Sequence, residues 1–182
     1  MFNLLIIGGT GFIGRSIYNY LLNNPVGKKF KKIYILSRKN KISFLKKNNR
    51  FQTIKIKTNI TKTKSLPDTN LIIYLAKLKN SKSDIFAAQN ISKILSKKKS
   101  KTKFLYVSSG AVYGYLNKKK NLNENYLKKN KRVKFKDSKK NDYALSKIKC
   151  EKIFLDLESK IFKVKIARCF TFVGKNLISD KF

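Results

Sequence analysis

The 182-residue chain has no histidine, no tryptophan and only two cysteines. The lack of histidine excludes His-based acid–base catalysis, Ser-His-Asp triads and nearly all common zinc sites, so we expect no metal site. Two cysteines cannot form a disulfide framework, and Cys150 and Cys169 are expected to be buried, reduced thiols. The apolar runs at 4–7 and 71–76 are far shorter than a signal peptide core or a membrane span. These absences predict a cytoplasmic protein without a membrane segment.

Acidic residues are scarce as well: nine Asp and Glu stand against 44 Lys and Arg, which gives a formal net charge of +35. Strong basicity often indicates a nucleic-acid partner. Only five of the basic residues are arginine, however, and specific recognition of bases and phosphates favours the guanidinium group. The abundant Lys, Asn, Ile, Phe and Tyr are also what an A/T-rich genome would produce. We therefore expect no specific nucleic-acid site, and the alternative of a polyanion contact centres on a lysine-rich surface loop at 118–140.

Short apolar runs alternate with amphipathic stretches along the whole chain. Strands are predicted at 2–7, 32–37, 52–57, 71–76, 103–107 and 163–167, and helices at 12–22, 84–96 and 142–157. Strands that alternate with helices and are themselves almost continuously apolar predict a parallel sheet covered on both faces. The fold class is therefore α/β, in a single domain over residues 1–182.

A glycine-rich loop follows the first predicted strand and precedes the first predicted helix. Its glycines, Gly8, Gly11 and Gly14, are spaced G-x-x-G-x-x-G. Glycine permits a tight turn and a close approach of the backbone to a pyrophosphate, which the free N–H groups at the helix start can then bind. This context predicts a dinucleotide site. A ligand-free turn is the alternative.

The end of the second predicted strand indicates which dinucleotide is bound. An acidic residue there would hydrogen-bond the ribose 2′-hydroxyl of NAD. This chain has Ser37 and Arg38 instead, and a hydroxyl and a guanidinium suit a 2′-phosphate. We therefore predict NADP as the preferred cofactor, with NAD as the alternative in which Arg38 is only one more surface cation.

A second group of polar residues combines Ser109, after the fifth predicted strand, with Tyr143 and Lys147 on the last predicted helix. Tyr143 and Lys147 are four residues apart, so they share one helix face. A nearby cation lowers the pKa of a phenol, which would make Tyr143 an acid–base group in a chain without histidine. Ser109 is expected to hydrogen-bond the substrate, and Lys147 to hold the nicotinamide ribose.

The order of these motifs resembles that of the extended short-chain dehydrogenase/reductase family, which comprises NAD(P)-dependent nucleotide-sugar epimerases and dehydratases. The matching segments are 8–14, 107–114, 143–147 and 168–174. The resemblance implies a Rossmann-type doubly wound sheet with Ser109, Tyr143 and Lys147 as the catalytic residues. It also implies that the segment after the fourth strand lies along the cofactor. The cofactor-binding candidates are Gly8, Thr10, Gly11, Phe12, Ile13, Gly14, Ser37, Arg38, Asn59, Leu75, Ala76 and Lys147, and the substrate-contacting candidates are Ser109, Tyr143 and Thr171.

The chain departs from the family pattern in three places. Asn59 replaces an acidic residue that contacts adenine, and Thr171 replaces a substrate-side asparagine. Family members usually exceed 300 residues, so the C-terminal substrate lobe is expected to be largely absent here. An absent lobe should leave apolar surface exposed near 170–172.

Three functions follow as expectations. The first is an NAD(P)-dependent epimerase, dehydratase or reductase that acts on a nucleotide-activated sugar. The second is a truncated or split family member that binds the dinucleotide but is inactive alone, and the third is a basic polyanion-binding protein. The resemblance also implies a homodimer, for which the helix at 142–157 is the candidate interface.

Overall fold

A computed structural model describes residues 1–38, 43–114, 124 and 137–172. In chain order the elements are β1 (Phe2–Ile7), α1 (Phe12–Asn23), η1 (Pro25–Lys29), β2 (Phe30–Ser37), β3 (Gln52–Lys57), β4 (Leu71–Tyr74), α2 (Ser81–Leu95), β5 (Thr102–Ser109), η2 (Gly110–Tyr113), α4 (Ser138–Leu155) and β6 (Phe162–Cys169). All strand pairs are parallel, and the strand order is β3-β2-β1-β4-β5-β6. This arrangement confirms the predicted Rossmann-type α/β fold.

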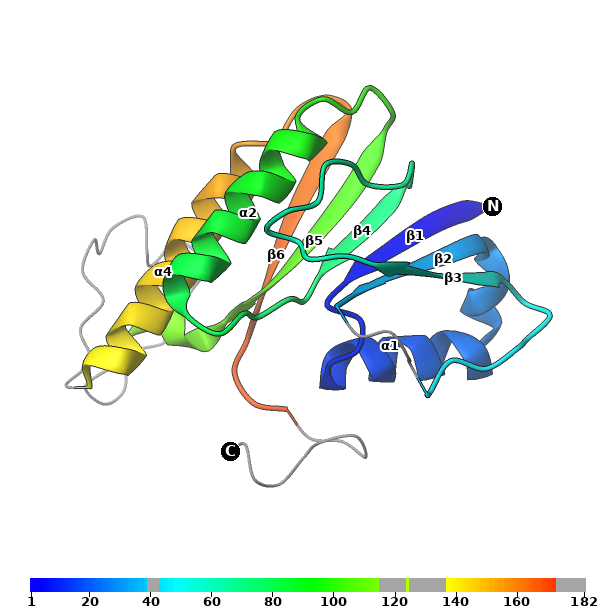
Figure 1. Cartoon of the computed structure of the whole chain (residues 1–182), viewed down its shortest axis with the longest axis horizontal. Coiled ribbons are helices and arrows are strands. Elements are labelled where there is room, and N and C mark those ends of the chain that lie inside the picture. Colours follow the sequence, from blue (N-terminus) through cyan, green and yellow to red (C-terminus); the bar gives the residue numbers. More distant parts are fainter. Residues whose placement is uncertain (39–42, 115–123, 125–136, 173–182) are drawn as a thin grey trace.

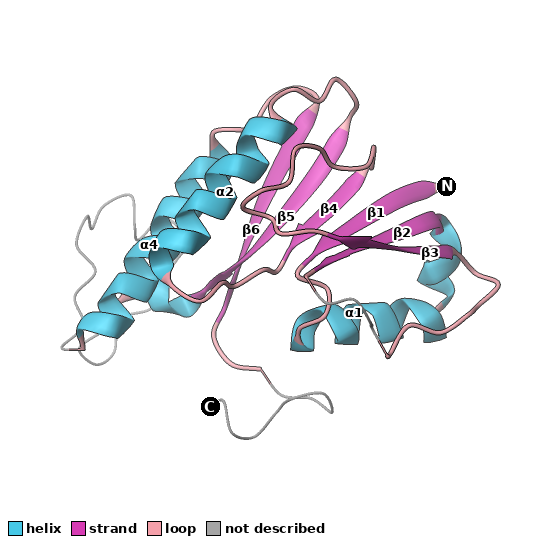
Figure 2. Cartoon of the chain, viewed as in Figure 1, coloured by secondary structure: helices cyan, strands magenta, loops and turns pink. Residues whose placement is uncertain are grey.

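The layers of the fold follow from the strand sequences. In β1, alternate side chains enter two different cores: Leu4 and Ile6 face the core beneath α1, whereas Leu5 and Ile7 face the core beneath α2 and α4. Figure 2 shows α1 on one side of the sheet and the adjacent α2 and α4 on the other. A strand that is buried on both faces requires the continuous apolar run from which it was predicted.

The helices on the second face pack on an aromatic cluster. Tyr74 and Phe154 contact each other, and each of them also contacts Phe104 and Tyr106, in tilted or edge-to-face pairs whose ring centres lie 4.8 to 6.5 Å apart. All four side chains are almost fully buried. Rings in these orientations add stabilisation beyond the apolar area that they bury, so this cluster fixes α4 against β4 and β5.

The α1 side of the sheet is only partly covered. Among the described residues no helix covers β5 and β6 on this side, and a cavity of about 490 Å³ lined by Leu71, Ile73 and Leu105 lies there. The expected double layer of helices is therefore complete only over the strands near α1. As expected, apolar surface is exposed near 170–172, since Phe170 is 71% exposed.

Three local details differ from the sequence-based expectation. Helix α4 begins at Ser138 rather than at 142, because the Asp137 side chain accepts a hydrogen bond from the Lys139 N–H at 2.8 Å and so caps the helix. The end of the expected 118–140 loop therefore belongs to α4, and its remaining residues, apart from Glu124 and the cap Asp137, lie outside the described part of the chain. Cys150 is buried as expected, whereas Cys169 is only partly buried. In the described ranges no helix is both long and apolar enough to span a membrane.

Candidate functional site

The glycine loop joins β1 to α1 at the point where the sheet order reverses. Strand β1 lies between β2 and β4, and the following helices cover opposite faces of the sheet. In open α/β sheets this reversal leaves a crevice at the carboxyl ends of the strands, where ligands bind. The described cavity at this position has a volume of about 260 Å³. It is lined by Gly8, Thr10, Gly11, Leu36, Ser37, Arg38, Thr58, Ile60, Leu75, Ala76, Lys77 and Leu78.

Two of the loop glycines are required by the fold. Gly8 has a φ of +82°, and a Cβ there would lie 2.7 Å from the Ala76 backbone. A Cβ on Gly14 would lie 2.4 Å from the backbone of Gly9, so Gly14 allows α1 to approach the loop. Both positions therefore exclude any side chain for reasons internal to the protein.

Gly11 differs from these two glycines. Its φ is −76°, which any residue adopts, and the nearest atom to a Cβ there would be the Gly8 carbonyl oxygen at 3.6 Å. The protein itself thus leaves room for a side chain at Gly11, and that room belongs to the cavity. Gly11 is also the N-cap of α1, where N–H groups of the first helical turn lack partners within the helix. A backbone of this shape fits a phosphate group.

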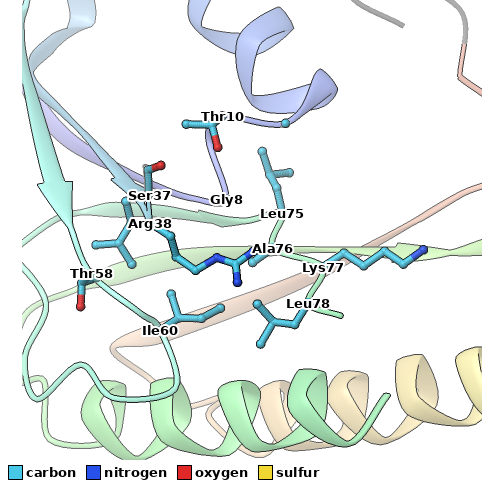
Figure 3. Close-up of a pocket in the computed structure, with 12 residues that line it drawn as sticks. Gly8, Thr10, Ser37, Arg38, Thr58, Ile60, Leu75, Ala76, Lys77 and Leu78 are labelled. Atoms are coloured by element: carbon cyan, nitrogen blue, oxygen red, sulfur yellow. The ribbon is translucent and has the colours of Figure 1, made fainter. Parts of the chain in front are cut away.

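The cation at the end of β2 lies over the same cavity. Figure 3 shows the exposed Arg38 side chain extending across the cavity toward Ala76. Ser37, which precedes it, is buried in the cavity wall. The structure thus brings Ser37, Arg38, Leu75 and Ala76 together with the glycine loop, as the sequence predicted.

Five of the predicted cofactor residues do not line this cavity: Asn59, Phe12, Ile13, Gly14 and Lys147. Asn59 is exposed, and its side chain accepts hydrogen bonds from the N–H and hydroxyl groups of Thr61. Phe12 and Ile13 are half-buried in the first turn of α1, and the Phe12 ring contacts Phe172 edge-to-face at 5.9 Å. Gly14 packs on Gly9.

Five residues of the cavity wall were missed: Leu36, Thr58, Ile60, Lys77 and Leu78. All of them lie at or just after the carboxyl ends of β2, β3 and β4. The only sequence signal for them is that position, because these residue types carry no motif of their own.

Ser109, Tyr143 and Lys147 meet beside this cavity, at the interface between β5 and α4. The Tyr143 hydroxyl hydrogen-bonds with the Ser109 side chain, whose oxygen also accepts from the Ala111 N–H at 3.2 Å. The Lys147 ammonium lies 5.7 Å from the centre of the Tyr143 ring, but it donates its hydrogen bond to the Tyr106 hydroxyl at 3.2 Å. None of the three residues lines the 260 Å³ cavity.

The expected effect of Lys147 on Tyr143 is not found. Burial raises the pKa of the Tyr143 phenol, and the hydrogen bond to Ser109 opposes this only in part. Burial also lowers the pKa of Lys147, so this ammonium is itself destabilised. The sequence spacing placed the cation on the correct helix face but could not reveal that its hydrogen bond goes to Tyr106.

A buried carboxylate and an ion pair hold the segments around Ser109, Tyr143 and Lys147. The buried Asp84 on α2 accepts a hydrogen bond from the Leu78 N–H at 2.7 Å and so holds the segment after β4. On the far side, Arg168 forms a bidentate pair with the buried Glu151, with Nη2 and Oε2 at 2.8 Å, and donates to the Tyr113 hydroxyl at 2.9 Å. The predicted substrate residue Thr171 is exposed and does not line the cavity.

Comparison with known proteins gives a family match. The sequence model described as "NAD dependent epimerase/dehydratase family" matches residues 4–182. No curated protein matches the sequence.

Several solved structures share the fold at low identity. A dTDP-glucose 4,6-dehydratase double mutant (DesIV) from Streptomyces venezuelae with NAD and DAU bound is 16% identical, with a TM-score of 0.73 over 98% of this chain and 58% of that one. RMD from Pseudomonas aeruginosa complexed with NADPH is 20% identical, with a TM-score of 0.68 over 100% of this chain and 58% of that one. A nucleoside-diphosphate-sugar epimerase from Agrobacterium tumefaciens is 15% identical, with a TM-score of 0.63 over 92% of this chain and 52% of that one. The chain thus spans less than three fifths of the length of these proteins.

Proposed function

Because the chain belongs to the NAD-dependent epimerase/dehydratase family, we propose that it binds a nicotinamide dinucleotide at the glycine loop and acts on a nucleotide-activated sugar. The observation that carries this proposal is the position of the Tyr143–Ser109 pair beside a cavity into which Gly11 opens. A dinucleotide site next to a hydrogen-bonded phenol supports hydride transfer coupled to proton transfer.

We propose NADP as the preferred dinucleotide and NAD as the alternative. Arg38 is placed to pair with a 2′-phosphate, since it follows β2 and extends across the cavity. Similar structures were solved with NAD or with NADPH, so both forms are compatible with this fold. Gly8 and Gly11 would let the backbone approach the pyrophosphate, and the start of α1 would donate N–H groups to it.

The proposed chemistry assigns one role to each of Ser109, Tyr143 and Lys147. When bound, the dinucleotide supplies the hydride acceptor. Tyr143 as phenolate takes the proton from a sugar hydroxyl, and Ser109 donates a hydrogen bond to the same oxygen. Lys147, whose ammonium lies 5.7 Å from the centre of the Tyr143 ring, would hold the ribose of the nicotinamide. Since burial raises the pKa of Tyr143, oxidation should become faster as the pH rises toward that pKa.

The test is the substitution Tyr143→Phe, which removes the hydroxyl but keeps the ring. We expect turnover of a nucleotide-sugar panel to fall by at least about 100-fold, because the acid–base group is lost. Dinucleotide affinity should stay within a few-fold, since Tyr143 does not line the cavity. Turnover equal to that of the unsubstituted chain would remove Tyr143 from this role.

A second candidate function is dinucleotide binding without turnover by this chain alone. It is favoured by two observations. None of Ser109, Tyr143 and Lys147 lines the cavity, and Thr171 is exposed. Specific dinucleotide binding without turnover of any nucleotide sugar would support this candidate. A homodimer through α4 and a polyanion contact at 118–140 stay predictions.

A further inference from the structure

Lys77 connects the two halves of the site. It follows β4 directly, and it is one of the residues that line the cavity at the glycine loop. Figure 3 shows its side chain running away from Arg38 and out of the cavity. Its ammonium lies 4.8 Å from the centre of the Tyr143 ring, within the range of a cation–π contact. A lysine on the cavity wall therefore ends beside the phenol that is proposed to transfer the proton.

The position of Lys77 is fixed by hydrogen bonds on both sides. The Leu75 N–H donates to the Ile7 carbonyl at 2.8 Å, which ties the segment to β1. The Leu78 N–H donates to the Asp84 carboxylate at 2.7 Å, which ties it to α2. The backbone of Lys77 is thus held between two anchored neighbours, and only its side chain is left to adjust.

Lys147 provides a useful contrast with Lys77. Its ammonium lies farther from the Tyr143 ring, at 5.7 Å, and it donates to the Tyr106 hydroxyl. It is 5% exposed, and its pKa is lowered chiefly by burial and also by repulsion from Lys77. Lys77 is exposed, so its charge remains hydrated while its ammonium contacts the ring.

The charged and hydrogen-bonding groups around Tyr143 come from four elements. Lys147 lies on the same helix, Ser109 ends β5, Asp84 lies on α2, and Lys77 follows β4. Asp84 disfavours the phenolate, and burial does so more strongly, whereas the hydrogen bond with Ser109 favours it. The ammonium groups of Lys77 and Lys147 lie 4.8 and 5.7 Å from the ring centre, and a positive charge at such a distance attracts a phenolate.

We propose that Lys77 is a positioning residue that holds the Tyr143 ring and stabilises its phenolate form during proton transfer. The role of Lys77 in turnover rests on the proposed function. Its effect on the titration of Tyr143 does not depend on that function. A cation within a few ångströms of a phenolate attracts it, and partial exposure weakens this attraction without abolishing it.

The decisive experiment follows the titration of Tyr143 in the full chain and requires no turnover. The protein is labelled with [ζ-¹³C]tyrosine, and the Tyr143 signal is identified by its loss in Tyr143→Phe. In Lys77→Met, which keeps most of the length of the side chain without its charge, the titration midpoint should move to higher pH. Lys77→Arg should restore it. The matched control Lys79→Met, two residues away and exposed, should leave it unchanged.

An unchanged midpoint in Lys77→Met, or an equal shift in Lys79→Met, would overturn the proposal. If the protein turns over a nucleotide sugar, Lys77→Met should lower kcat at neutral pH about three- to tenfold. The rise of kcat with pH should also shift to higher pH. Dinucleotide affinity should stay within a few-fold. Weakened affinity with an unchanged Tyr143 midpoint would make Lys77 a phosphate ligand and refute the positioning role. Absence of turnover in the unsubstituted chain would refute the proposed function, and the titration would still decide the role of Lys77.

Discussion

Gly11 offers the sharpest test of the cofactor site, because a side chain there affects the ligand and not the fold. In Gly11→Val the new Cβ meets no protein atom closer than 3.6 Å, and the backbone at this position is already in a region open to every residue. The added group occupies space in the cavity between the glycine loop and the end of β4. We therefore expect the substituted chain to fold normally and to bind the dinucleotide much more weakly.

The effects of Gly11→Val on stability and on dinucleotide affinity can both be estimated from the local structure. Valine is a poorer N-cap than glycine by up to about 1 kcal/mol, and the reduced freedom of the unfolded chain offsets this by about 0.4–1 kcal/mol. The free energy of unfolding should thus change by less than about 1 kcal/mol. A phosphate displaced from one N–H donor at the start of α1 loses a charge-assisted hydrogen bond of about 1.5–3 kcal/mol, which corresponds to roughly 10- to 150-fold weaker binding.

The assay is a calorimetric titration of NADP⁺ and NAD⁺ at about 0.3 M salt. This salt concentration suppresses the attraction of any phosphate to a chain of net charge +35. The control is Gly14→Ala, in which the Cβ would lie 2.4 Å from the Gly9 backbone, so thermal stability should fall. Undiminished dinucleotide binding by Gly11→Val would refute the placement of the pyrophosphate. A loss of stability in Gly11→Val as large as that in Gly14→Ala would refute the argument from free space.

Three further predictions concern specificity and stability. Arg38→Asp should lower the ratio of NADP to NAD affinity at least about tenfold, because it replaces a cation with an anion at the proposed 2′-phosphate site, and an unchanged ratio in the same titration would contradict this. Glu151→Gln should lower the free energy of unfolding by about 2–3 kcal/mol in urea, since it removes the buried charge that pairs with Arg168, and a change within error would show that the pair contributes nothing. A hydrogen bond from Lys98 and a second one from Ser100 lower the pKa of Asp68, so this carboxylate stabilises the fold above its unfolded pKa, and that contribution is lost as the pH falls through the lower folded pKa. Asp68→Asn should therefore narrow the difference in Tm between pH 6 and pH 3, and an unaltered difference would exclude this contribution.

The sequence predicted the fold because the relevant signals are local. The bounds of β1 and β3 agree with those predicted, and the other strands and the three long helices were predicted to within a few residues at most ends. The largest error was at α4, whose start depends on the Asp137 cap rather than on hydrophobic periodicity. The 3₁₀-helices η1 and η2 were missed, since segments of four or five residues carry no periodic pattern.

The candidate site was predictable in part for the same reason. The glycine spacing and the Tyr143–Lys147 pair each lie within a few residues, so the sequence alone determined the glycine loop and the helix face of the phenol. The partners of these groups come from distant strands. Strand order brings Lys77 to Tyr143 and brings the ends of β2, β3 and β4 to one cavity with the glycine loop, and burial raises the pKa of Tyr143. Only the tertiary structure decided these contacts, because pairing between segments that are far apart in the sequence depends on the packing of the whole sheet and not on any local pattern.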